Sequence, residues 1–400
     1  MPLAVIKAPV SRSFLVLNAH PAGCALNVQR MVKQTKAAIP GTGLGNVVVI
    51  GGSAGYGLAS LIAAVFGHGA KALNLCFERP PEPGKDRTGS AGWYNLAEVH
   101  RLAKAEGRTI VTHNGDAFST AMKQQAIATL KDRFGKVDTL VYSIASPRRT
   151  DPTTGHTFAS VLKPIDVAYQ SKSVNLETDQ VVTANVLPAS EAEIAATVKV
   201  MGGEDWAYWV EALRHAGLLA PGFRTVAYSY IGPRVTHPIY RAGTIGRAKD
   251  HLETTAHRLD YHLRATLGGG AWVSVNKALV TQAASAIPVV PLYISMLYRV
   301  MKTKGTHEGT CEQIIRLFRE HIGPGRSPLL DEQGRIRLDD LELDPVVQAE
   351  VAALWDQIDT GNLATLSDYA AFKREFRQLF GFEVEGVDYN APVEIDAMLE

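Results

Sequence analysis

Apolar runs and stretches of helical periodicity alternate along the first part of the chain. The clearest unit spans residues 46–66, where the β-branched run 47–50 is typical of a strand buried on both faces of a parallel sheet. Glycines follow at positions 51, 55 and 57, and apolar residues then recur at helical spacing from 58 to 66. A strand, a glycine turn and a helix in this order are the context that a dinucleotide-binding motif requires.

The same alternation continues as far as residue 143, and it predicts the fold class. Strands that alternate with helices favour an α/β protein with right-handed crossovers, here a doubly wound parallel sheet of the Rossmann type with added helical and loop segments. The expected strands are 5–6, 14–16, 47–50, 72–77, 109–112, 138–143, 224–230 and 271–275. The expected helices are 28–38, 58–66, 95–105, 117–133, 190–200, 205–216, 246–267, 311–322, 345–357 and 366–379.

We expect one large Rossmann-type unit over residues 1–400. Its parts are a dinucleotide-binding half at 46–150, a catalytic and substrate-binding half at 151–305 and a C-terminal helical extension at 306–400. Residues 144–179 have no clean periodicity. Because ligands bind at the carboxyl ends of parallel strands, we expect this stretch to shape a substrate cleft.

The glycine turn has a specific chemistry. Glycine permits positive φ and removes the Cβ that would keep the backbone away from a pyrophosphate, which the helix N-terminus then attracts. Glu78 lies 21 residues after Gly57 (78 − 57), where an acid accepts hydrogen bonds from the adenosine ribose. It favours NADH over NADPH, although Arg79 could hold a 2′-phosphate. The alternative is a glycine turn that serves packing alone.

Tyr240 and Lys249 form the second informative pair. A tyrosine that delivers a proton near neutral pH needs a lowered pKa or a neighbouring cation, and a lysine supplies one. On one continuous helix the two side chains would point to opposite faces. They converge only if Tyr240 lies in the loop before the helix and Lys249 in its first turns, a break that Gly243 and Gly246 make plausible. A tyrosine packed near a solvated lysine is the alternative.

Composition excludes several classes. With 41 basic and 40 acidic residues the net charge is +1, which argues against a nucleic-acid binder. Cys24, Cys76 and Cys311 are widely spaced, so we expect neither a disulfide framework nor a metal site, and a cytoplasmic location. The first residues contain neither a long apolar stretch nor a clear cleavage site, so we expect no secretory signal. The apolar stretch 278–297 is interrupted by polar residues and prolines, so no integral membrane segment is expected.

Six motifs together resemble the FabV-class trans-2-enoyl-ACP/CoA reductases, large relatives of the short-chain dehydrogenase/reductase superfamily. The resemblance covers essentially the whole chain. The eight residues between Tyr240 and Lys249 distinguish this class from ketoreductases and from the smaller enoyl reductases. The motifs are GGSAGYGLA (51–59), LCFE (75–78), HNGDAFS (113–119), VYSIASPRR (141–149), AYSYIGPRVTHPIYRAGTIGRAK (227–249) and NKALVTQAASAIPVVPLYIS (276–295).

The resemblance also implies residue roles. Tyr240 would be the proton donor, Lys249 would bind the cofactor ribose, and Tyr230 would contact the substrate. The remaining cofactor positions that it implies for NADH or NAD are Gly51, Gly52, Ser53, Ala54, Gly55, Tyr56, Phe77, Glu78, Asp116, Ala117, Ile144, Ala145, Leu279, Val280 and Thr281.

The implied activity is NADH-dependent reduction of the C2–C3 double bond of trans-2-enoyl thioesters, the last step of the fatty-acid elongation cycle. The thioester carrier, acyl carrier protein or CoA, is left open, and a monomer is the expected state. Alternatives are a short-chain-type carbonyl reductase and a non-enzymatic NADH sensor. Residues 306–400 contain no glycine motif that would cradle phosphate, so no flavin is predicted.

Overall fold

A seven-stranded parallel sheet forms the centre of the computed structural model, which describes residues 3–12, 15–39, 41, 43–85 and 87–399. The strand order is β14-β13-β12-β7-β4-β5-β6, so the chain builds outward from β4 and then returns to its other side. This reversal is the switch point of a doubly wound sheet, and the predicted Rossmann-type fold is confirmed. The strands are β4 (Asn46–Ile50), β5 (Lys71–Cys76), β6 (Ile110–Asn114), β7 (Val137–Tyr142), β12 (Leu219–Ser229), β13 (Gly270–Val275) and β14 (Ile336–Arg337).

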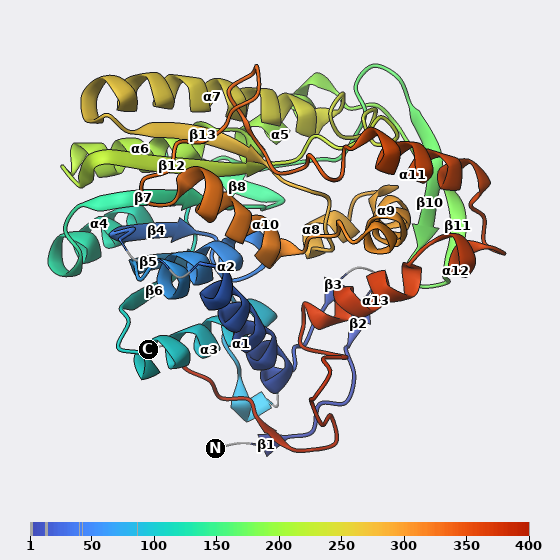
Figure 1. Cartoon of the computed structure of the whole chain (residues 1–400), viewed down its shortest axis with the longest axis horizontal. Coiled ribbons are helices and arrows are strands. Elements are labelled where there is room, and N and C mark those ends of the chain that lie inside the picture. Colours follow the sequence, from blue (N-terminus) through green and yellow to red (C-terminus); the bar gives the residue numbers. More distant parts are fainter. Residues whose placement is uncertain (1–2, 13–14, 40, 42, 86, 400) are drawn as a thin grey trace.

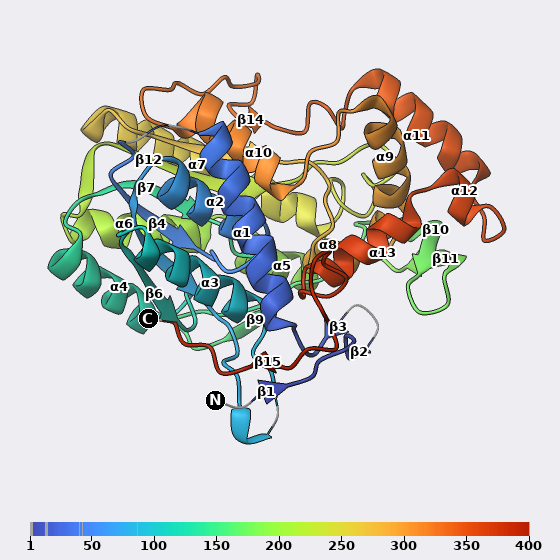
Figure 2. The ribbon, with the colours of Figure 1, turned by 60° about the horizontal axis from the view of Figure 1, so that its bottom comes forward.

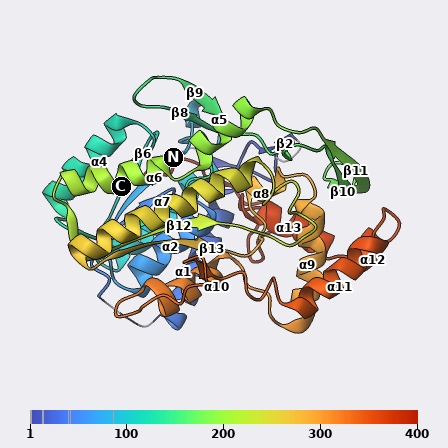
Figure 3. The same cartoon turned by 90° about the horizontal axis from the view of Figure 1, so that it is seen from above.

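Helices cover both faces of the sheet (Figure 3). Strand β4 shows why two layers are needed, because successive side chains point to opposite faces. Val47 and Val49 pack into one apolar cluster, and Val48 and Ile50 pack into another. The first cluster is covered by α1 (Pro21–Ala38), α2 (Gly55–Ile62), α3 (Ala91–Ala105) and α10 (Thr310–Leu317); the second is covered by α4 (Thr120–Arg133), α6 (Glu204–His215) and α7 (Thr244–Leu267).

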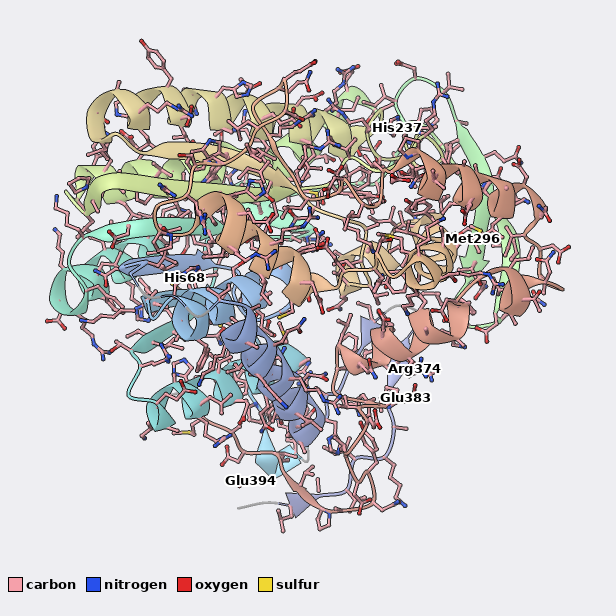
Figure 4. The ribbon with its side chains drawn as sticks, in the orientation of Figure 1. His68, His237, Met296, Arg374, Glu383 and Glu394 are labelled. Atoms are coloured by element: carbon pink, nitrogen blue, oxygen red, sulfur yellow. The ribbon has the colours of Figure 1, made fainter. Side chains whose placement is uncertain are left out.

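A further group of elements forms a lobe on the right of Figure 1. Its central helix, α9 (Val290–Lys304), is buried along almost its whole length, as expected for a helix that is apolar on most sides. Met296, labelled in Figure 4, is fully buried within it. Around α9 lie α8 (Gln282–Ser285), α11 (Pro345–Gln357), α12 (Leu363–Leu366), α13 (Tyr369–Gln378) and the antiparallel pair β10 (Tyr169–Asn175) and β11 (Gln180–Val186).

The two ends of the chain lie close together (Figure 2). Strand β1 (Leu3–Ala4) pairs antiparallel with β15 (Val393–Glu394). Two aromatic side chains of α3 hold the C-terminal segment, because Tyr94 Oη donates to Ile395 O at 2.9 Å and Trp93 Nε1 donates to Ala397 O at 2.6 Å. The C-terminal segment therefore packs against α3.

Some predicted boundaries are wrong. Helix α1 starts at Pro21 and not at 28, because the side chain of His20 accepts a hydrogen bond from Gly23 N at 3.2 Å and caps the helix. Histidine is not among the usual N-cap residues, so the sequence did not signal this start. Strand β12 begins at Leu219 and not at 224, through an irregular register against β7.

The weakly patterned segments hold short elements. The predicted strand 5–6 is wrong, since β1 ends at Ala4, and position 14 of the predicted strand 14–16 lies outside the described residues. Among the described residues, no helix combines the length and the apolar character needed to cross a membrane. The remaining elements are β2 (Ser11–Arg12), β3 (Leu15–Val16), β8 (Arg148–Thr150), β9 (Thr157–Ala159), α5 (Glu191–Met201), and the short turns Ala63–Gly67, Pro83–Lys85 and Phe318–Ile322.

Candidate active site

A cavity of about 1220 Å³ lies at the carboxyl ends of the sheet strands, beside the switch point. Gly51 after β4, Glu78 after β5, Ile144 after β7 and Tyr230 after β12 all line it. Every site residue expected from the sequence also lines this cavity, with the exception of Gly52. One concave site therefore gathers residues from both halves of the sheet.

The glycine turn packs against β7 with little free space. Gly51 has φ +88°, and a Cβ on it would overlap Ser143 O. A Cβ on Gly57 would overlap Gly51 O, so the glycine at 57 allows α2 to start directly against the turn. A Cβ on Gly52 would overlap the side chain of Asn74, so only glycine fits at this position without a shift of Asn74.

The N-terminus of α2 faces this cavity. Ala54 occupies the N-cap position and provides no side-chain hydrogen bond to the first turn. The unpaired N–H groups and the partial positive charge of the helix are therefore available to an anion. Ser53, Ala54 and Gly55 line the cavity at this point, so the turn presents backbone donors where a pyrophosphate would bind.

Glu78 is held in a defined position. Its Oε1 accepts from Ser53 Oγ at 2.6 Å and its Oε2 accepts from Ser90 Oγ at 2.5 Å. The backbone of Glu78 is fixed by Asn114, whose Oδ1 accepts from Glu78 N at 2.7 Å and whose Nδ2 donates to Glu78 O at 2.8 Å. A Cβ on Gly92 would overlap this carboxylate, so α3 leaves room for it only with glycine.

Arg79 is engaged by the protein itself. Its Nη2 donates to Leu17 O at 2.9 Å and to Thr88 O at 3.2 Å. Arg79 and Glu78 both line the cavity, and Nη2 of Arg79 is committed to backbone carbonyls. The local charge at the ribose end of the site favours a 2′-hydroxyl over a 2′-phosphate.

A buried ion pair fixes the loop that follows β6. Lys123 Nζ donates to Asp205 Oδ1 at 2.7 Å and also to Ala117 O at 3.1 Å. Trp209 Nε1 donates to the same carbonyl at 3.1 Å. Asp116 and Ala117 line the cavity, so this network holds the loop at the end where adenine is expected.

Tyr240 and Lys249 meet the geometric condition set by the sequence. Tyr240 lies in the loop before α7, and Lys249 lies in the second turn of that helix. Lys249 Nζ donates to Tyr228 O at 3.1 Å. Burial lowers the pKa of Lys249 to about 8, opposed by the charge of Glu253. The ammonium is thus poorly solvated and available to hydroxyl groups in the cavity.

The two tyrosines of the site differ in their hydrogen bonds. Their rings meet edge to face, with centroids 5.0 Å apart. Tyr230 Oη donates to Glu342 Oε1 at 3.1 Å. Within the described part of the chain, no hydrogen bond joins the Tyr240 hydroxyl to the protein, and burial raises its pKa. Tyr240 therefore keeps its proton and can donate it to a ligand in the cavity.

The loop after β13 closes the site opposite the glycine turn. Tyr56 Oη donates to Lys277 O at 2.8 Å, which ties this loop to α2. Val280 N donates to Tyr298 Oη at 3.2 Å, and Thr281 caps α8 by accepting from Ala284 N at 3.0 Å. Leu279, Val280 and Thr281 consequently face the cavity from a fixed backbone.

Ser90 and Lys277 line the cavity and Glu342 is buried beside them, and the sequence did not identify any of the three. Ser90 lies in a proline- and glycine-rich loop, which gives no signal of a carboxylate partner. Lys277 lies in the motif at 276–295, but the resemblance implies no role for it. The side chain is buried, its Nζ donates to Ala278 O at 3.0 Å, and burial lowers its pKa to about 8. Glu342 comes from the C-terminal segment and had no local pattern around it.

The residues present fit a nicotinamide dinucleotide. The turn at Gly51 and the uncapped start of α2 suit the pyrophosphate, and Glu78 suits the adenosine ribose. Lys249 and the loop at Thr281 lie on the opposite side of the switch point, where the nicotinamide half would reach. The cavity continues past them to Tyr240, which leaves room for a second ligand.

Three family models match the chain in consecutive segments. Residues 6–83 match the NAD(P)H binding domain of trans-2-enoyl-CoA reductase, and residues 87–322 match the trans-2-enoyl-CoA reductase catalytic region. Residues 330–393 match a model described as the enoyl reductase FAD binding domain.

The residues of this last segment do not fit a flavin. A dinucleotide needs glycine backbone and free helix N–H groups at its pyrophosphate. Within the described residues, the glycines at 334, 361, 381 and 386 lie outside the cavity lining, and Gly381 packs against His20 O. Helix α11 is capped by the carboxylate of Asp344, which would repel phosphate. The segment instead packs on α9 through apolar side chains.

Relatives match along the whole chain. The trans-2-enoyl-CoA reductase (NADH) of Ruminiclostridium cellulolyticum is 50% identical over 396 residues, 99% of each chain. An enoyl-acyl-carrier-protein reductase (NADH) of Coxiella burnetii is 51% identical over 394 residues, 98% of this chain and 97% of the relative. The crystal structure of Treponema denticola trans-2-enoyl-CoA reductase in complex with NAD superposes with a TM-score of 0.93 at 45% identity, over 99% of this chain and 100% of the other. The chain belongs to the trans-2-enoyl-CoA reductase family.

Proposed function

We propose that this protein reduces the C2–C3 double bond of trans-2-enoyl thioesters with NADH, as the last step of fatty-acid elongation. The observation that carries the proposal is that one cavity contains a pyrophosphate-binding turn, the ribose-side carboxylate of Glu78 and the uncommitted hydroxyl of Tyr240. The full-length relatives named as NADH-dependent enoyl reductases support the same reaction.

In this proposal the chain binds and orients NADH through named groups. The backbone from Gly51 to Tyr56 holds the pyrophosphate, Glu78 and Phe77 hold the adenosine ribose, and Lys249 holds the nicotinamide ribose. When bound, NADH supplies the hydride that adds to C3. Burial of Lys249 keeps its ammonium away from water, which strengthens its hydrogen bonds to the ribose hydroxyls.

Tyr240 is the proposed donor to the thioester oxygen. Negative charge grows on this oxygen as the double bond is reduced, so a hydroxyl aimed at it stabilises the transition state more than the ground state. The Tyr240 side chain is only 8% exposed, so water competes little for its hydroxyl. The edge-to-face contact with Tyr230 holds its ring in one orientation.

The acyl chain is proposed to lie along the apolar wall formed by the loop after β13 and by α9. This wall is continuous with the nicotinamide side of the cavity, so the apolar tail is removed from water while the double bond lies near the cofactor. The wall residues that line the cavity include Leu279, Val280, Ile287, Val290 and Ile294.

The test follows NADH absorbance with the purified protein and a trans-2-enoyl thioester. NADPH and a β-keto thioester form parallel arms, and each acyl chain is supplied both as CoA and as acyl-carrier-protein thioester. We expect NADH loss with the enoyl substrate alone. Loss with the keto substrate but not with the enoyl substrate would assign the protein to the short-chain carbonyl reductases, and tight NADH binding without turnover would indicate a sensor.

We further propose that the protein works as a monomer in the cytoplasm. The lobe around α9 packs beside the sheet unit around its own apolar cluster, and the C-terminal end of the chain packs against α3, so both segments bury surface within one chain. Cys24, Cys76 and Cys311 are buried free thiols, which suits a reducing compartment. Light scattering coupled to gel filtration tests the first point, and a dimer mass would contradict it.

A further inference from the structure

A fully buried carboxylate lies next to the cavity and has no part in the reaction described above. Glu342 is 0% exposed and sits in the turn between β14 and α11. Its Oε1 accepts from Tyr230 Oη at 3.1 Å and from Tyr293 Oη at 2.7 Å, and its Oε2 accepts from Ala278 N at 2.7 Å. It thereby links β12, the loop after β13 and α9.

The directions of these hydrogen bonds are fixed by chemistry. A backbone N–H only donates and an ionised carboxylate only accepts, so the single hydrogen of Tyr230 points at Glu342. Tyr230 therefore turns the lone pairs of its oxygen, and not its hydrogen, toward the rest of its surroundings. Tyr240, in edge contact with that ring, has no such partner among the described residues.

The surroundings of Glu342 oppose the cost of burying its charge. The pKa of its carboxyl is raised, because burial outweighs the ammonium of Lys277, the N–H of Ala278 and the hydroxyl of Tyr293, which favour the charged form. Asp339, a second buried acid in the same connection, acts in the same direction as burial. Three hydrogen-bond donors and one cation thus surround the carboxylate. They are needed because an unpaired carboxylate at this depth would be strongly destabilising.

We propose that Glu342 is a positioning residue of the reductase site, which orients the hydroxyl of Tyr230 and, through the ring contact, the side chain of Tyr240. The inference rests on the proposed function and deepens it. It also gives the C-terminal segment a part in the reaction, since Glu342 belongs to the segment matched by the FAD-binding model. That segment supplies an acceptor for a tyrosine of the site.

The informative substitution is Glu342→Gln. Because Ala278 N must still donate, the amide oxygen takes the place of Oε2 and the amide nitrogen faces Tyr230 and Tyr293. The amide then donates to Tyr230 Oη, and the Tyr230 hydrogen turns away from its original direction. A hydroxyl reversed in this way no longer holds its own ring, or the Tyr240 ring in edge contact with it, in the wild-type position, so we expect kcat to fall about tenfold, the size of one misdirected hydrogen bond.

The control is Asp339→Asn, a matched exchange of acid for amide in the same connection. Asp339 is also 0% exposed, but it pairs with Arg337 through hydrogen bonds of 2.7 and 2.8 Å and does not line the cavity. We expect this variant to melt at a lower temperature than the wild type, with kcat within about twofold, because its site does not contact the tyrosines.

The decisive measurement is a double-mutant cycle with Tyr230→Phe, in which kcat and KM for NADH are determined for each variant. If Glu342 acts through Tyr230, Glu342→Gln has no further effect in the Tyr230→Phe background, and KM for NADH stays within about twofold throughout. An equal loss in both backgrounds, or an unchanged kcat in Glu342→Gln, overturns the inference.

Two arms keep this outcome separate from other failures. Wild-type protein that does not consume NADH with an enoyl thioester refutes the proposed function, independently of any variant. Should the glutamine variant fail to fold, Glu342→Asp takes its place in the cycle. It keeps the charge but withdraws the carboxylate by one methylene from Tyr230, so the same coupling and the same fall in kcat are expected.

Discussion

Tyr230 and Tyr240 line the same cavity with their rings in edge contact, and they differ in whether the hydroxyl hydrogen is already donated to the protein. Tyr230 donates to Glu342, whereas Tyr240 makes no hydrogen bond with the described protein groups. A donor that is already paired must break a bond before it serves a substrate, and an unpaired donor need not. This difference, and not the ring type, makes Tyr240 the better candidate for stabilising the developing charge.

Replacement of Tyr240 by phenylalanine tests that assignment. The ring and its edge contact remain, so only the hydrogen bond to the thioester oxygen is lost. We expect kcat to fall about 10²- to 10³-fold, as for other single donors at a developing oxyanion, with little change in KM for NADH. Stopped-flow or steady-state kinetics of NADH absorbance with a trans-2-enoyl-CoA measure this fall in kcat. Tyr261→Phe is the control, because Tyr261 is 80% exposed on α7; full activity in Tyr240→Phe would refute the role.

Lys249 leads to a pH prediction. Its pKa is lowered to about 8, first by burial, so the free enzyme carries the ammonium below that pH and loses it above. The neutral amine has fewer donors for the ribose, so kcat/KM for NADH, which reports the free enzyme, should decline as pH rises through about 8. Lys249→Arg keeps its charge and should show no decline up to about pH 10. A wild-type profile that is flat over this interval would contradict the prediction.

At the scale of elements, the junction of β4 and α2 depends on the absence of a single methyl group. Gly57 lies directly against Gly51 O, so Gly57→Ala must push the start of α2 away from the turn. We expect a lower melting temperature and a KM for NADH raised about tenfold or more, because the helix N–H groups leave the pyrophosphate position.

The control for this variant is Gly217→Ala. Gly217 has φ +70° with open space around its Cβ position, so alanine there costs about 1–2 kcal/mol of backbone strain without a clash. It should lower stability while leaving KM for NADH unchanged. Melting curves by circular dichroism and NADH kinetics separate the two effects. Equal KM values in both variants would mean that the turn tolerates a shifted helix.

At the scale of the whole molecule, what the sequence could predict depends on how local the signal is. The strand at 47–50, the turn at Gly51 and the acid at Glu78 follow one another along the chain, and the structure places the turn and the acid at one cavity. Tyr230 and Glu342 are 112 residues apart, and no period or spacing links them. Their contact depends on how the lobe around α9 packs beside the sheet. Such long-range packing leaves no local pattern in the sequence from which it could be predicted.

The start of α1 was missed for a different reason. His20 caps it, and its ring also packs at 4.7 Å between centroids on Tyr389 of the C-terminal segment. Because the N-cap residue here also makes a tertiary contact, it is not one of the usual N-cap residues serine, threonine, aspartate or asparagine. Tertiary structure therefore overrides the local rule where the two ends of the chain meet.

Ligand-dependent stability gives the last prediction and concerns the whole chain. A ligand that binds only the folded protein stabilises it by about 2.7 kcal/mol at a hundredfold excess over its Kd. NADH contacts the turn at Gly51 and the lysine of α7 in the proposed site, so it should raise the melting temperature. FAD at the same concentration should not, because the segment 330–393 fills its interior with side chains that pack on α9.

Circular dichroism melts with NADH, FAD or buffer make the comparison, with Glu78→Ala as the matched variant. Loss of the ribose-side carboxylate should reduce the rise in melting temperature that NADH causes. The melting temperature without ligand should change little, since Ser53 and Ser90 remain as polar neighbours of the site. A rise with FAD that is retained in Glu78→Ala would place a flavin outside the NADH site. The C-terminal segment would then be a second cofactor domain, and its contact with Tyr230 through Glu342 would connect two redox sites instead of completing one.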